Sequence, residues 1–299
     1  MPISTRTTLQ RQLDDLYHDR FSAYTGGKHL SYPLLPVVTE RYLANRIVVL
    51  GQETNGYYNQ HEGSQSGEDL PDYLKGTHEV EVDGRYATRY AHFIRALRTA
   101  GHGGHFWRFA RLLYRPGSPL AGQEMIDEQD ELAHMWLNLF AVEAVVHAGA
   151  ALGRPTSNSE LRQEVSQLQG DLLRETFELL RPRLVLACTG PRLDEALAMS
   201  LGLDSLTFET IDNAASPRWR ADPSHTLSTW QLGKTRFSLA DGTTVPLIRT
   251  YHPTYFMGRI NQRDARYVKP PGRGSLKEAC TASVLLDASA ILANSTSAT

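Results

Sequence analysis

Polar side chains with complementary chemistry directly follow, or lie within, apolar runs of the sequence. Gln52 and Glu53 come directly after one run. Asn138 lies inside a second run, and His252 follows a third. In an open parallel sheet the residues at the carboxyl ends of the strands gather at one edge. A carboxylate can position a water molecule there, and amide and imidazole groups can stabilise a developing negative charge. The pattern therefore predicts a hydrolytic site at one edge of a sheet.

The elements that must position these side chains are short and apolar. Uninterrupted apolar runs predict buried strands, at residues 46–52, 135–141, 183–191 and 245–252. The second of these runs could instead continue into a helix over 142–151. Helical spacing of apolar residues is found at 8–24, 90–100, 105–114, 159–180, 193–201 and 275–293. Buried strands that alternate with helices favour an α/β fold, and we expect a three-layer α/β/α sandwich with a central four-stranded parallel sheet.

A single domain over residues 1–299 accommodates all of these elements. We expect it to carry a helical N-terminal extension, a long polar insertion, a hairpin insertion and a disordered tail of small residues. Their expected bounds are 1–40, 59–104, 205–245 and 294–299. The Gly233-Lys234 and Asp241-Gly242 pairs are typical of hairpin turns.

The composition excludes several classes of protein. The chain has 299 residues, 41% apolar and 21% charged, which is long enough to bury a core without disulfides or metal. Its two cysteines exclude a disulfide framework and any four-cysteine metal site. No apolar run approaches a membrane span, and the first residues lack the apolar block of a secretory signal. We therefore expect a cytoplasmic protein with no membrane contact, no metal and no cofactor.

Net charge limits the way in which the chain could bind nucleic acid. The 31 Lys and Arg against 33 Asp and Glu leave a formal charge of -2, unlike the strongly basic proteins that coat nucleic acid. Between Tyr251 and Lys277, however, six basic residues stand against the single acid Asp264. This segment is either a solvated loop or a local footprint on phosphates.

The runs and the residues after them resemble, in chain order, the motifs of the uracil-DNA glycosylase superfamily. Residues 47–58, IVVLGQETNGYY, resemble its first motif, in which a strand leads into a GQDPYH-type loop. Asn138 resembles the asparagine that closes the second strand. Residues 184–191, LVLACTGP, are similar to the third strand, and residues 251–256, YHPTYF, to the HPSPLS-type loop. The resemblance implies a uracil-DNA glycosylase-like fold and base excision by a flipping enzyme.

Roles for individual residues follow from this resemblance. Glu53 would orient the attacking water and stabilise the sugar cation. Gln52, with its backbone N–H, would contact a carbonyl of the base, and Asn138 would bind the Watson–Crick edge of a flipped pyrimidine. His252 would donate to the leaving base as negative charge grows on it. These roles match the needs of an oxocarbenium-like transition state.

Further residues are candidates for contacts with the base and with DNA. Tyr58 and Phe106 are candidates to stack on the flipped base, although aromatic residues at helical spacing usually pack inward. Residues after His252 would fill the gap in the duplex, or belong to the core, and the bases beyond them would hold phosphates. These DNA-binding candidates are Thr254, Tyr255, Phe256, Arg259, Arg263, Arg266 and Lys269.

The first motif departs from the uracil-specific branch in an informative way. Glu53 replaces the usual aspartate, and Thr54 replaces a proline. Asn55 and Gly56 stand where that branch has tyrosine and histidine, and the tyrosine there excludes 5-substituted pyrimidines. Asn55 leaves a smaller, polar wall and could bond to a substituent, so we group it with Glu53 and His252 as a catalytic candidate. A bulky 5-modified pyrimidine is the favoured substrate.

The sequence thus predicts a monomeric, monofunctional DNA glycosylase that acts on duplex DNA. Its substrate would be a hypermodified base, such as the glucosylated cytosine of phage DNA, and it would leave an abasic site in antiphage defence. No lysine lies in the water-positioning motif, so Schiff-base lyase chemistry has no nucleophile there. The alternatives are a uracil-DNA glycosylase of base excision repair, a catalytically inactive DNA-binding protein of the same fold, and a hydrolase of free nucleosides.

Overall fold

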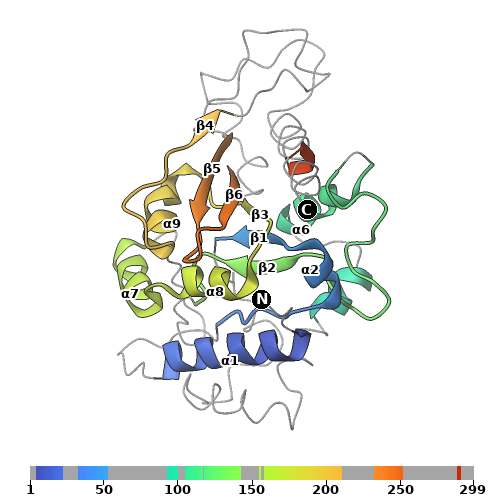
Figure 1. The fold of residues 1–299 in the computed structure, drawn as a ribbon, viewed down its shortest axis with the longest axis horizontal. Coiled ribbons are helices and arrows are strands. Elements are labelled where there is room, and N and C mark those ends of the chain that lie inside the picture. Colours follow the sequence, from blue (N-terminus) through green and yellow to red (C-terminus); the bar gives the residue numbers. More distant parts are fainter. Residues whose placement is uncertain are drawn as a thin grey trace, which may run out of the picture.

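A mixed sheet with helices on both faces forms the centre of the molecule (Figure 1). The computed structural model describes residues 5–22, 33–52, 93–99, 105–116, 118–142, 155, 158–210, 232–251 and 288–290. Every structural statement below concerns these residues.

The sheet has six strands in the order β2-β1-β3-β6-β5-β4. The strands are β1 Ile47–Gly51, β2 Met135–Asn138, β3 Leu184–Ala187, β4 Glu209–Thr210, β5 Leu232–Ser238 and β6 Thr244–Thr250. The four runs predicted as strands are β2, β1, β3 and β6, and they are parallel to one another. The α/β class is therefore confirmed. The expectation that the sheet has only four parallel strands is wrong, because β5 and β4 extend it in antiparallel fashion.

A hairpin that begins inside the predicted 205–245 segment and extends to Thr250 explains this difference. β5 pairs with β6 along its whole length, and the chain reverses at Asp241-Gly242, as predicted. Gly242 has φ +83, and its N–H donates to the carbonyl of Leu239. The turn predicted at Gly233-Lys234 is wrong, since both residues lie inside β5. The backbone of both residues pairs with β6. Without this pairing β6 would be the edge strand of the sheet, with its backbone groups exposed.

The helices agree with most of the predicted segments. Their bounds are α1 Arg6–Ser22, α2 Glu40–Asn45, α6 His105–Ala110, α7 Ser159–Gln169, α8 Leu172–Leu180 and α9 Asp194–Ser200, with 3-10 turns η1 Arg111–Tyr114 and η2 Pro191–Leu193. Residues 93–99 are also helical. The segment 159–180, predicted as one helix, is two helices, because Gly170 adopts φ +50 after α7 ends. Such a left-handed residue is a common helix terminator.

Both faces of the sheet are buried against helices. Val48 and Leu50 of β1 belong to a cluster that includes buried residues of α1, α7, α8 and α9. Ile47 and Val49 point to the opposite face and pack with residues of α6 and η1. Because side chains alternate along a strand, this division explains why the strands are uninterrupted apolar runs. No helix in the described ranges is long and apolar enough to cross a membrane.

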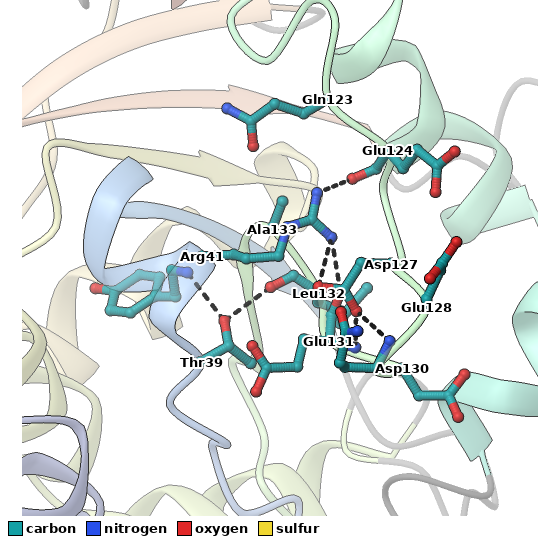
Figure 2. Close-up of polar contacts among 12 residues, drawn as sticks. Thr39, Arg41, Gln123, Glu124, Asp127, Glu128, Asp130, Glu131, Leu132 and Ala133 are labelled. Carbon is teal, nitrogen blue, oxygen red and sulfur yellow. Dashed lines mark hydrogen bonds and ion pairs between the residues drawn. The ribbon is translucent and has the colours of Figure 1, made fainter.

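A polar network holds the loop that enters β2 (Figure 2). The Arg41 guanidinium donates to the carbonyl of Glu131 at 2.9 Å, contacts the carbonyl of Glu124, and lies 3.7 Å from the Asp127 carboxylate. The Thr39 hydroxyl donates to the carbonyl of Leu132 at 2.8 Å. These contacts fix the amino end of β2, and so support the strand that ends at Asn138.

A buried histidine beside this network makes stability depend on pH. His134 is 1% exposed, and its Nδ1 lies 2.6 Å from the Tyr114 hydroxyl. Burial, with a smaller contribution from the Arg41 charge, lowers the pKa of His134 from 6.5 to about 3. The folded protein therefore keeps this imidazole neutral at pH values where the unfolded chain protonates it.

We expect His134 to contribute stability that is complete above pH 6.5 and is lost as the pH falls toward 3. One proton taken up only by the unfolded chain lowers the free energy of unfolding by about 2 kcal/mol between pH 6.5 and pH 5. Urea unfolding of wild type and His134→Gln at both pH values measures this, because glutamine can still accept from Tyr114 but does not titrate. Equal losses in the two proteins would contradict the assignment.

Candidate active site

The carboxyl ends of β1 and β2 lie side by side. Gly51, the last residue of β1, is paired in register with Asn138, the last residue of β2. Beyond the strands, the N–H of Leu139 donates to the carbonyl of Gly51 at 3.0 Å, and the N–H of Phe140 to that of Gln52 at 2.9 Å. The predicted base-binding residues Gln52 and Asn138 are therefore neighbours at one edge of the sheet.

The Asn138 amide lies directly over Gly51. A Cβ atom built on Gly51 would be 2.4 Å from Oδ1 of Asn138 and 3.4 Å from Cε2 of Phe106. Only a residue without a side chain leaves room for this arrangement. The structure thus brings Asn138 and Phe106, which are far apart in the sequence, together above the end of β1.

The amide nitrogen of Asn138 is buried without a partner. The side chain is 8% exposed, and its Nδ2 makes no hydrogen bond within the described part of the chain. Leaving a buried donor unpaired costs about 1–3 kcal/mol, and native proteins rarely do so without a functional reason. The amide therefore offers a fixed donor to a molecule that enters this edge.

Aromatic rings form a wall beside Asn138. Trp136 precedes Asn138 by two residues on β2 and so points to the same face. Its ring centroid lies 4.9 Å from that of Trp107 and 6.3 Å from that of Phe106. Phe93 stacks on Trp136 at 5.4 Å. Phe106 and Phe93 are half-buried while Trp107 and Trp136 are buried, and Phe106 is the half-buried ring that lies 3.4 Å from a Cβ built on Gly51, beside the Asn138 amide.

The Gln52 side chain joins two of the strand ends. Its Nε2 donates to the backbone carbonyl of Thr189, beyond β3, at 2.7 Å. This bond fixes Gln52, the residue directly before Glu53 in the sequence. Because the side-chain amide already makes this bond, the contact predicted between Gln52 and a base would be made by its backbone N–H. That contact stays a prediction.

The ends of β3 and β6 supply further polar groups. Gly190 adopts φ +75, and its N–H donates to the carbonyl of Thr250 at 2.9 Å. A Cβ on Gly190 would lie 3.4 Å from Cδ1 of Tyr251. The hydroxyls of Thr189 and Thr250 are buried, and neither has a partner among the residues described. Together with Asn138, these two residues place three buried polar groups without a partner among the described residues at the carboxyl ends of the parallel strands.

A charged pair behind β6 holds this edge in place, and the sequence reading missed it. Arg249 is 2% exposed, and its Nε lies 3.0 Å from Oδ1 of Asp194, the first residue of α9. The Phe208 ring covers the guanidinium at 4.6 Å. Burial raises the pKa of Asp194 to about 6, with Arg249 opposing that shift. The signal was an arginine inside an apolar run, which requires a partner when buried.

Several predicted site residues lie outside the described residues. They are the catalytic candidates Glu53, Asn55 and His252, the stacking candidate Tyr58, and the DNA-binding candidates Thr254, Tyr255, Phe256, Arg259, Arg263, Arg266 and Lys269. In the chain, Glu53 directly follows Gln52 and His252 directly follows Tyr251. Their roles stay predictions.

Neither a metal site nor a reactive thiol is found in the described ranges. No three His, Cys, Asp or Glu residues group there in a way that could hold a metal ion. Cys188, after β3, is buried, and burial raises the pKa of its thiol far above neutrality. A protonated, enclosed thiol is a poor nucleophile.

Comparisons of the chain with protein-family models, with curated proteins and with solved structures found no match.

Proposed function

We propose that this protein is a monofunctional DNA glycosylase that hydrolyses the N-glycosidic bond of a flipped-out modified pyrimidine. The observation that carries the proposal is the buried Nδ2 of Asn138, which has no partner among the described residues, beside the Phe106 ring at the carboxyl ends of β1 and β2. An asparagine amide has a donor and an acceptor, which can pair with the edge of a pyrimidine. An aromatic ring next to it can stack on the face of the same base.

The reaction follows from the sequence motifs that continue these strands. The bond between C1′ and the base nitrogen breaks, and its electron pair leaves with the base. Glu53 stabilises the positive charge on the sugar and orients a water molecule whose oxygen bonds to C1′. That water releases one proton to solvent as its oxygen bonds to C1′, and the departing base anion takes up one proton from solvent, so that the products are a sugar hydroxyl and a neutral base. His252 donates a hydrogen bond to the departing base.

The proposed substrate is a pyrimidine with a large substituent at C5. In the uracil-specific branch of the superfamily that the motifs resemble, a tyrosine stands at the position of Asn55, so the wall that excludes such substituents would be smaller and polar here. Such a wall would admit a hypermodified, for example glucosylated, cytosine of phage DNA, and this substrate would make the protein part of antiphage defence. The basic residues after Tyr251 would hold the phosphates of the duplex.

An excision assay on defined DNA tests the proposal. We would incubate the protein with duplexes that contain glucosylated hydroxymethylcytosine, uracil or ordinary cytosine, and count alkali-labile abasic sites. We expect sites only in the first duplex, and a loss of at least about a hundredfold with Glu53→Gln, whose uncharged amide cannot stabilise the sugar cation.

The other outcomes separate the competing functions. Excision of uracil alone would indicate a repair glycosylase. No excision, with salt-dependent duplex binding that Glu53→Gln retains, would indicate a DNA-binding protein that lacks catalysis. No binding of duplex DNA would contradict the proposal altogether and favour an enzyme of free nucleosides.

A further inference from the structure

We propose that Gln169 is a positioning residue that holds Asn138 in its base-binding place. This inference rests on the proposed function, because it concerns the same site. Gln169 is the last residue of α7, on the face of the sheet opposite the Asn138 side chain. It does not touch the proposed pocket, and the sequence motifs do not include it.

Gln169 binds the backbone directly after Asn138 with both ends of its amide. Its Nε2 donates to the carbonyl of Leu139 at 2.9 Å. Its Oε1 accepts from the N–H of Ala141 at 2.6 Å. The side chain is 3% exposed, so no water competes for these two groups. A single side chain therefore satisfies two backbone groups of the bend that follows β2.

The same bend is held from the other direction by β1. The N–H of Leu139 donates to Gly51, and the N–H of Phe140 donates to Gln52. The bend is thus fixed between the end of β1 and the end of α7. Asn138 is the residue from which this bend departs, and its Nδ2 makes no bond of its own within the described residues. Its position is consequently set by its backbone, which is held by the pairing of β2 with β1, by these four hydrogen bonds and by the bond from the N–H of Leu34 to the carbonyl of Ala141.

The identity of residue 169 supports a specific role. Leu161, Val165 and Gln169 lie four residues apart along α7, and all three are buried. Gln169, the third of these buried positions, carries an amide at a place that would suit a leucine side chain. A buried amide is costly unless it is fully hydrogen-bonded, and Gln169 meets that condition only because the bend presents a carbonyl and an N–H at the right spacing.

A matched control lies on α1. Gln10 donates through Nε2 to the carbonyl of Pro36 at 2.9 Å and accepts through Oε1 from the N–H of Val38 at 2.7 Å. It makes the same pair of backbone bonds, to residues two apart, and its Nε2 also bonds the Asp14 carboxylate at 2.9 Å. Gln169→Leu and Gln10→Leu therefore each remove two bonds to backbone groups, and only Gln169 binds the bend directly after Asn138.

The test measures kcat and KM for base release from the modified duplex, at a temperature where all variants are folded. We expect Gln169→Leu to lower kcat/KM by at least about tenfold, since small misplacements of a binding group are costly, and Gln10→Leu by less than about twofold. In an Asn138→Ala background, Gln169→Leu should cause no further loss, because contacting residues that act through one another are not additive. Equal effects of the two glutamine variants, or an additive loss in that background, would overturn the inference.

Gln169→Glu provides a second test with the shape of the side chain retained. A protonated carboxyl can still donate to Leu139, whereas an ionised one cannot and repels that carbonyl. Activity of this variant relative to wild type should rise as the pH falls from 8 to 5. A ratio that does not change with pH would contradict the role of the donated bond. If wild type itself releases no base from any duplex, the proposed function fails before the variants are compared, and this inference fails with it.

Discussion

Asn138→Ala is expected to lose base release by about a hundredfold or more while the protein remains as stable as wild type. The amide is the group we assign to the edge of the flipped base, so its removal takes away a donor fixed for the transition state. Its Nδ2 has no partner in the described structure. The substitution therefore removes a buried polar atom that has no hydrogen-bond partner there. Such a removal leaves the free energy of unfolding nearly unchanged or raises it. Single-turnover release and urea unfolding measure the two effects.

Leu137→Val is the matched control for this prediction. Leu137 is the preceding residue of β2, is also buried, and packs in the cluster on the opposite face. Its truncation should cost about 1 kcal/mol of stability and leave base release unchanged. An Asn138→Ala protein that is several kcal/mol less stable, or that releases base at the wild-type rate, would show that the amide serves only the fold.

Gly51→Ala is expected to reduce base release to a similar extent by displacing the same amide. The new methyl carbon would lie 2.4 Å from Oδ1 of Asn138 and 3.4 Å from the Phe106 ring, so at least one of them must move. A displacement of about 1 Å can cost about a hundredfold in rate. Overpacking of this kind lowers stability by about 1–3 kcal/mol. Release kinetics and unfolding of the variant check both expectations.

The cause of that loss can be identified by combining variants. In the Asn138→Ala background the closest atom is absent, so Gly51→Ala should cost markedly less stability than it does alone. Gly122→Ala is a control, because Gly122 has φ +82 and no atom within 4 Å of a new Cβ. It should lose about 1 kcal/mol through backbone strain and keep its activity. A Gly51→Ala loss that is the same in both backgrounds would contradict the contact.

The parallel part of the sheet could be predicted because of its burial. β1 and β3 have every side chain buried, and burial on both faces produces the continuous apolar runs that the sequence shows. The antiparallel extension could not be predicted in the same way. β5 is only partly buried and contains Gly233 and Lys234, residues that are typical of turns, and it becomes a strand through its pairing with β6.

The candidate site could be predicted in part for similar reasons. Asn138 can be predicted as a site residue because an amide inside an apolar run is costly to bury unless it binds a partner. Arg249 and Gln169 carry the same signal, a polar residue in a buried pattern, and were missed because their partners lie on other elements. The meeting of Asn138, Gly51 and Phe106 depends on strand order and on the packing of α6. The spacing of residues along the chain predicts neither the strand order nor the packing of α6.

Mass spectrometry of the bases released by wild type and by Asn138→Ala tests the central claim most directly. Both proteins would be incubated with duplex DNA that contains glucosylated hydroxymethylcytosine, and with uracil DNA as a comparison. We predict that wild type releases the intact modified base and leaves an abasic site, and that Asn138→Ala releases about a hundredfold less. No free base from either DNA, or equal release by the two proteins, would contradict the claim that this edge of the sheet binds a flipped base for excision.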